Sequence, residues 1–218
     1  MAMLLNTGQS IVAQRNAQFQ ANSKNTHVAK LSELTNGPGF ELTAFVDKEA
    51  ISALLDQTGS EGIWIYPAVE VDLNDDLCMI AVGADTNRIE LRDEKDNFCF
   101  CCYTDASKST RQISIGEGAE MVNDRRPKNT IKNRAAFQDI VNNDRLKALF
   151  HREQVSKILE EPGDRIRLDI VDLNFTDSTD AVRTVAMTPA DNQGVNQGDM
   201  MASLMPCPPS CPDDGGYL

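Results

Sequence analysis

Apolar positions with the spacing of one helix face occur in two separate parts of this chain. They lie at i, i+3 and i+4 in each part: Ile51, Leu54 and Leu55 in the first, and Val155, Ile158 and Leu159 in the second. The two sets differ by a constant 104 positions (155 − 51). Gly59 and Gly163 follow where many helices end in a left-handed residue, so we expect a positive φ at both.

An apolar, β-prone run with a polar turn in its middle follows each of these helices, which predicts a hairpin in both places. The turns fall at residues 74–76 and 176–180. Asp47 is a candidate N-cap of the first helix, because its carboxylate can accept hydrogen bonds from the unpaired amides of the first turn. The internal similarity therefore predicts a tandem repeat of helix–strand–strand units.

Outside these repeats, the residue pattern predicts five more elements. Apolar and β-prone residues predict strands at 88–91 and 98–103. Helices are expected over residues 7–34, where many Asn and Gln separate the apolar positions, and over 135–142 and 145–150.

These expectations divide the chain into three parts. Residues 1–110 would hold the first repeat with an N-terminal helix, 111–192 the second repeat, and 193–218 an irregular tail rich in Cys and Pro. Residues 104–132 are rich in Ser, Thr, Asn, Gly and charge, which is typical of a linker. We predict an α+β fold of two tandem helix–strand–strand repeats, with the hairpins joined in a mostly antiparallel sheet and the helices packed on one face.

Three short motifs stand out: GSEGIWIY at residues 59–66, CMIAVGAD at 78–85 and PCPPSCP at 206–212. They resemble a Bacteroidetes-type family of small uncharacterised bacterial proteins with an EGIRIY-like strand, a second strand ending near VGxD and a C-terminal CPPxC tail. The chain departs from that family at Trp64, where the family has Arg, and its second repeat has Arg165 and Asp169 in place of the Gly and Tyr. The resemblance implies a tandem doubling of a single-copy family, and it carries no function.

Composition and charge narrow the classes of partner. The 218 residues carry 21 Lys and Arg against 33 Asp and Glu, a net charge of −12. This disfavours nucleic acid, whose phosphates need a basic patch, and it disfavours an anionic membrane surface. No apolar run approaches the ~20 residues of a membrane span, and residues 1–5 lack the basic segment of a secretory signal. We expect a cytoplasmic protein whose six cysteines are thiols.

Cysteines form the most conspicuous cluster of chemically active residues. Cys99, Cys101 and Cys102 follow the first repeat, and Cys207 and Cys211 follow the second. Thiolates of Cys99, Cys101, Cys207 and Cys211 would hold zinc if the two groups converged, although only the tail pair has the usual C-x₂₋₄-C spacing. The alternatives are a regulated disulfide and free cysteines that pack as small apolar residues.

Trp64 and Tyr66 are the candidate binding residues, because they share one face of the expected strand. If only the opposite face were buried, they would form an exposed aromatic patch suited to a partner. The alternative is that both faces of the sheet are covered. The chain has two histidines, His27 and His151, and nothing in the sequence pairs either with a nucleophile, so we predict no catalytic residue.

These observations favour a non-enzymatic binding or assembly module that contacts a protein partner or a second copy of itself. The first alternative is a thiol-based metal-binding or redox protein that uses Cys99–Cys102 and Cys207–Cys211. A small hydrolase is the weaker alternative.

Overall fold

The computed structural model describes residues 43–69, 77–123, 147–173, 182–203 and 205–207. Within these ranges the strands pair antiparallel throughout. The elements, in chain order, are β1 (Thr43–Asp47), α3 (Lys48–Leu55), β2 (Gly62–Val69), β3 (Leu77–Ala84), β4 (Cys99–Tyr103), β5 (Arg111–Ile113), α4 (Ile115–Asn123), β6 (Lys147–His151), α6 (Arg152–Glu160), β7 (Arg165–Leu173), β8 (Val182–Ala190), β9 (Met201–Ala202) and β10 (Met205–Cys207).

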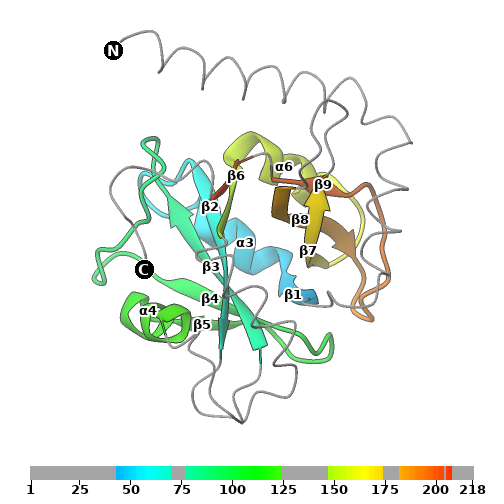
Figure 1. Cartoon of the computed structure of the whole chain (residues 1–218), viewed down its shortest axis with the longest axis horizontal. Helices are drawn as coiled ribbons and strands as arrows, with labels where there is room; N and C mark the ends of the chain where they lie inside the picture. The colour runs from blue at the N-terminus through cyan, green and yellow to red at the C-terminus, as the bar shows by residue number, and fades with distance from the viewer. Residues whose placement is uncertain (1–42, 70–76, 124–146, 174–181, 204, 208–218) are drawn as a thin grey trace, which may run out of the picture.

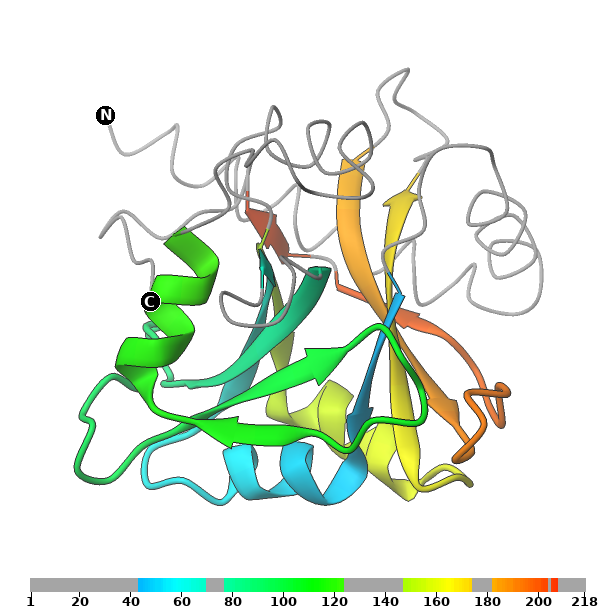
Figure 2. The ribbon, with the colours of Figure 1, turned by 90° about the horizontal axis from the view of Figure 1, so that it is seen from below.

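All the strands belong to one curled sheet. Its order is β10-β6-β2-β3-β4-β1-β7-β8-β9, and β5 pairs with β4 off this path. The sheet curls into a half-barrel, and α3 and α6 lie together at one end of it (Figures 1 and 2). The α4 helix lies outside the half-barrel, beside the β2–β3–β4 part of the sheet (Figure 2).

Each of α3 and α6 is preceded, without a break, by a five-residue strand. Both of these leading strands pair with the other half of the chain: β1 pairs with β7, and β6 pairs with β2. The β2–β3 and β7–β8 hairpins are antiparallel, as predicted, and the tips of both hairpins lie outside the described residues. Because the leading strands are exchanged, neither half completes its part of the sheet by itself.

Two apolar cores lie on opposite faces of the sheet. The interior core joins the inward side chains of the half-barrel to the apolar faces of α3 and α6, including Ile51, Leu54 and Val155. The second core lies between α4 and the outer face of β2, β3 and β4. In the two predicted helix faces every residue is buried except Leu159, which is partly buried.

The two ends of the sheet approach each other at Ser203. Its amide donates to the Val185 carbonyl in β8 at 2.9 Å, and its hydroxyl donates to the Leu149 carbonyl in β6 at 2.6 Å. The Thr184 hydroxyl donates to the Ser203 carbonyl at 2.9 Å. The stretch that contains β9 and β10 therefore closes the seam between β8 and β6.

Each of α3 and α6 begins with a cationic residue that caps the C-terminus of the other helix. Lys48 donates to the carbonyls of Leu159, Glu161 and Pro162 at the end of α6. Arg152 donates to the carbonyls of Leu55 and Ser60 at the end of α3. The last carbonyls of a helix have no partner within it, so these contacts fasten the two helices together.

The predicted left-handed backbone conformation of the glycine after each helix is confirmed. Gly59 has a φ of 83° and Gly163 a φ of 97°. A side chain at Gly163 would also clash with the Ala190 carbonyl oxygen. Asp47 occupies the N-cap position of α3 as predicted, but its side chain makes no capping hydrogen bond, because its carboxylate accepts from the Thr110 amide at 2.9 Å and pairs with Arg165 at 3.1 Å.

The predicted α+β fold, with two helix–strand–strand repeats and helices packed on one face of a sheet, is wrong. The described chain is mostly antiparallel strand, with α3 and α6 at the end of a half-barrel and α4 on the opposite face of the sheet. The physical reason lies in β1 and β6, short strands that each pair on one side with a strand of the opposite half, β7 and β2, and so join the two halves into one curled sheet around the helices.

The elements predicted outside the two repeats are confirmed in one case and wrong in others. The strand at 98–103 is confirmed as β4, whereas residues 88–91 contribute only an isolated bridge between Ala84 and Glu90. The helix expected over 145–150 is wrong, since β6 occupies that place, and the presumed linker 104–132 contains β5 and α4. The tail expected to be irregular contributes β9 and β10.

The helices expected over 7–34 and 135–142 lie outside the described residues. None of the helices in the described ranges is long and apolar enough to cross a membrane.

Candidate functional site

Trp64 and Tyr66, the predicted binding residues, are buried, with 1% and 0% of their surface exposed. They lie on the outer face of β2, within the second core. The centroids of their rings are 6.4 Å apart, and the ring planes are tilted relative to each other. The expected exposed aromatic patch is therefore not formed by these two side chains. The structure has the alternative arrangement, in which both faces of this part of the sheet are covered.

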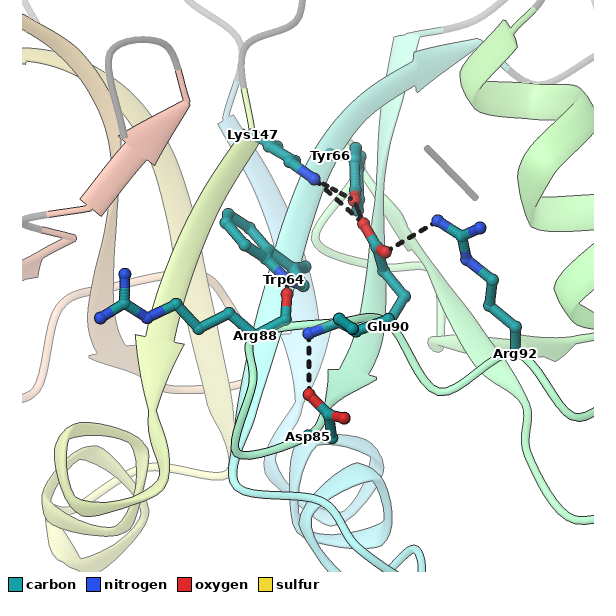
Figure 3. Close-up of polar contacts among 8 residues, drawn as sticks. Trp64, Tyr66, Asp85, Arg88, Glu90, Arg92 and Lys147 are labelled. Atoms are coloured by element: carbon teal, nitrogen blue, oxygen red, sulfur yellow. Dashed lines mark hydrogen bonds and ion pairs between the residues drawn. The ribbon is translucent and has the colours of Figure 1, made fainter. Parts of the chain in front are cut away.

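A buried ion pair lies against these aromatic rings (Figure 3). Lys147 in β6 places its Nζ 3.1 Å from Oε1 of Glu90, 3.3 Å from the Tyr66 hydroxyl and 4.4 Å from the centroid of the Trp64 ring. The Tyr66 hydroxyl donates to Glu90, and Arg92 lies 2.9 Å from the other carboxylate oxygen of Glu90. The side chains of Lys147 and Glu90 are 2% and 0% exposed.

The environment of Glu90 keeps its carboxylate charged. Burial acts to raise the pKa of Glu90, but the hydrogen bond from Tyr66 and the charge of Lys147 outweigh burial and lower the pKa. Glu90 follows β3 and Lys147 begins β6, so the pair joins the two halves of the chain across β2. Since both partners are closed to solvent and are bonded to each other, this cluster acts as an internal fastening rather than as a surface for a ligand.

The cysteines of the predicted metal site that the structure describes lie on different strands of the sheet. Cys99, Cys101 and Cys102 are buried free thiols in β4, whereas Cys207 lies in β10, with β6, β2 and β3 between these two strands. No group of metal-binding side chains is found among the residues that the structure describes, and Cys211 lies outside them.

Burial makes two of these thiols poor nucleophiles. It raises the pKa of Cys99 to about 12, and it raises the pKa of Cys102 as well. The Cys99 thiol donates to the Ser114 carbonyl at 3.3 Å. Because the thiolate is the reactive form of cysteine, the packing of β4 favours the expectation of small buried apolar residues. The strands β2 and β3 lie between Cys101 in β4 and His151 in β6, so the sheet order does not bring this thiol and this imidazole together.

Two exposed turns make the same hydrogen bonds. One follows β3 at residues 85–89 and the other follows β8 at residues 191–195, an offset of 106 positions (191 − 85). Asp85 accepts from the amides of Asn87 and Ile89, both at 2.8 Å. Its counterpart Asp191 binds the amides two and four positions ahead of it in the same way, both at 2.9 Å.

Further contacts hold these two Asp turns rigid. In each, the Asp amide donates to the carbonyl four residues on, at 2.8 Å in the first turn and 3.0 Å in the second. An isolated antiparallel β-bridge then pairs the residue after each turn with the end of the strand before it, Glu90 with Ala84 and Asn196 with Ala190. Across one intervening strand, Ala84 is level with the last residue of β6, which precedes α6, and Ala190 is level with the last residue of β1, which precedes α3. Both turns therefore lie at the end of the sheet where the helices lie.

Each Asp turn presents an exposed apolar side chain at its fifth position. Ile89 is 37% exposed and Val195 is 55% exposed, and they are the two exposed large apolar side chains of the described residues. The sequence contains a signal for Ile89 and Val195, because in both places an Asp is followed four residues later by a β-branched residue. It carried no meaning until the two loops were known to follow matching strands.

The first Asp turn also holds a strained residue. Arg88 has a φ of 69°, and Gly194, at the same place in the second turn, has a φ of 79°. A left-handed conformation costs a residue with a side chain roughly 1–2 kcal/mol. The Arg88 carbonyl accepts from the Trp64 indole at 2.8 Å (Figure 3), which helps to hold this conformation.

Comparison with known proteins yields no relative. No family model matches the chain, and neither does any curated protein or solved structure. The resemblance to the Bacteroidetes-type family and the tandem duplication therefore stay predictions.

Proposed function

We propose that this chain is a non-enzymatic binding or assembly module that contacts a protein partner, or a second copy of itself, through the two Asp turns. One observation carries the proposal. The two large apolar side chains left exposed in the described part of the chain, Ile89 and Val195, occupy the same position in two turns with the same hydrogen bonds. Scattered exposed apolar residues are ordinary, but their recurrence at matching positions is not explained by chance exposure alone.

The rigidity of the Asp turns supports a role in recognition. A loop whose amides are already bonded to its own Asp loses little conformational entropy when it binds, so more of the contact energy remains for affinity. Strained residues cluster at functional sites, and Arg88 is such a residue beside Ile89. The exposed guanidinium of Arg88 adds a group that forms bidentate bonds with carboxylates.

The test is a paired substitution that adds charge at both contact points, Ile89→Asp with Val195→Asp. We expect sedimentation velocity to show self-association of the wild type, or affinity capture to show a retained protein, and either to fall at least about tenfold in the variant. Loss of about 1.4 kcal/mol of contact energy has this effect on an equilibrium. The urea midpoint should stay close to that of the wild type, because both side chains are exposed.

The matched control adds the same two charges elsewhere, as Thr104→Asp with Ser109→Asp at exposed positions of the β4–β5 loop. It should behave as the wild type. Equal behaviour of wild type, turn variant and control in both assays would overturn the proposed function.

A further inference from the structure

The outer face of β7 and β8 differs from the matching face of β2 and β3. On β2 and β3 this face carries Trp64, Tyr66 and other apolar residues, and α4 covers it. On β7 and β8 it carries Arg167 and Asp169 opposite Thr188 and Ala186. The α3 and α6 helices pack in the interior core, so none of the described helices covers this polar face.

Two polar atoms on this face are buried without a partner. Asp169 and Thr188 are 2% and 1% exposed. Oδ1 of Asp169 accepts from Thr43 at 2.6 Å and from Arg167 at 2.9 Å, but Oδ2 of Asp169 and the Thr188 hydroxyl have no hydrogen-bond partner among the described residues. An orphaned buried polar atom costs about 1–3 kcal/mol, so such atoms indicate a partner.

The two atoms define the chemistry of that partner. Asp169 Oδ2 can only accept a hydrogen bond while the carboxylate is ionised, and the Thr188 hydroxyl can donate one. Asp169 and Thr188 are diagonal neighbours on adjacent strands, a separation of about 7–8 Å between Cα atoms that long side chains can bridge. A primary amide, with an N–H₂ donor and a carbonyl acceptor on one carbon, complements this pair.

We propose that this polar face is the docking site of the chain's own residues 1–42, held there by an Asn or Gln side chain on Asp169 and Thr188. The segment is joined to the face, since it leads into Thr43, whose hydroxyl already bonds Asp169. It is rich in primary amides: Asn6, Gln9, Gln14, Asn16, Gln18, Gln20, Asn22, Asn25 and Asn36. The proposal does not rest on the Asp turns.

Charge favours the same occupant. Residues 1–42 contain three cations, Arg15, Lys24 and Lys30, and two acids, Glu33 and Glu41, a net charge of +1. The rest of the chain then carries −13 (−12 − 1). The segment lacks the negative charge of the body, so repulsion does not oppose the docked state, and covalent attachment raises its effective concentration on the face.

Limited trypsin digestion of the full chain tests the docking site, because Arg15, Lys24 and Lys30 report on the segment. The variant is Thr188→Val, which keeps the shape of the side chain and removes only the hydroxyl. If that hydroxyl bonds the segment, we expect cleavage at these sites to become about tenfold faster, from the loss of one buried hydrogen bond. Thr188→Ser restores the hydroxyl and should return cleavage to nearly the wild-type rate.

Two results would overturn the inference. The first is cleavage of the wild type at these sites as fast as that of a synthetic peptide of residues 1–42. The second is a protected wild type whose protection is unchanged in Thr188→Val, which would place the segment on a different surface. Urea unfolding of the same variants separates docking from folding, since the Thr188 hydroxyl has no partner among the described residues and its removal should lower the midpoint by no more than the loss of one hydrogen bond to the segment.

Discussion

At the scale of single residues, the most informative feature is a buried charge pair that neither local stretch of sequence indicates. Lys147 opens a run that reads Lys-Ala-Leu-Phe-His, and in isolation it looks like an exposed helix residue. In the fold it is almost completely buried against Glu90, Tyr66 and Trp64. The charge of Lys147 is tolerated there because the interactions with these partners offset the free-energy cost of removing the charge from water.

The first prediction concerns this pair and pH. Replacing Glu90 with Gln leaves Lys147 buried without its counter-charge, so we expect a loss of about 3 kcal/mol at neutral pH, measured by urea unfolding. The folded pKa of Glu90 is lowered from its usual 4.5, so the unfolded chain binds more protons in the interval below 4.5. The share of stability from Glu90 is therefore present above pH 4.5 and is lost as the pH falls through the folded pKa.

The unfolding midpoint of the wild type should accordingly decline on acidification below that pH more steeply than the midpoint of Glu90→Gln. Glu94→Gln, a change at an exposed acid of the same loop, should leave both stability and its pH dependence close to those of the wild type. Parallel pH profiles for the wild type and Glu90→Gln would show that the carboxylate is not held in its charged form.

At the scale of elements, the helices α3 and α6 are short, and isolated helices of their length are not stable in water. They persist because each buries an apolar face in the interior core and because each is capped by a cation of the other. Arg152 presents a planar fork to two carbonyls, whereas Lys48 presents a point charge, and burial lowers the pKa of Lys48 despite the nearby charges of Glu161 and Asp164.

The second prediction follows from this capping. Arg152→Met keeps the aliphatic stem and removes the donors, so we expect a loss of about 1–2 kcal/mol in urea unfolding. Lys48→Met should cost less. The two caps lie at opposite ends of helices about 12 Å long, so the double variant should show nearly the sum of the two losses. Lys157→Met serves as the control, because Lys157 makes an exposed pair with Glu153. A loss from Lys157→Met as large as that from Arg152→Met would contradict the capping role.

At the scale of the whole molecule, the half-barrel depends on contacts between residues far apart in the chain. β1 reaches β7, β6 reaches β2, and the stretch from β9 to β10 joins β8 to β6. Such a topology pays loop-closure entropy before its pairings form. The strands on either side of the seam at Ser203, β9 and β10, are only two and three residues long.

The third prediction concerns that seam. Ser203→Ala removes the donor to the Leu149 carbonyl, and we expect a loss of about 1–2 kcal/mol of stability. Hydrogen exchange should become faster in residues 201–203 and 147–151 while the β2–β3 hairpin keeps its protection. Ser109→Ala, at an exposed loop position, should change neither quantity. Uniform acceleration of exchange across all strands would show that the seam is not a separate unit of the fold.

The sequence by itself determined the elements whose residues carry a local signal. The apolar faces of α3 and α6, the glycines that end them, β4 and the two hairpins all follow from spacing, β-propensity and turn chemistry within short windows. Tertiary structure decided β1 and β6, the curl of the sheet, the burial of Trp64 and Tyr66, and the pairing of Lys147 with Glu90. These features arise from contacts between distant segments, and a run such as residues 147–151 takes the strand form only because β2 offers it hydrogen bonds.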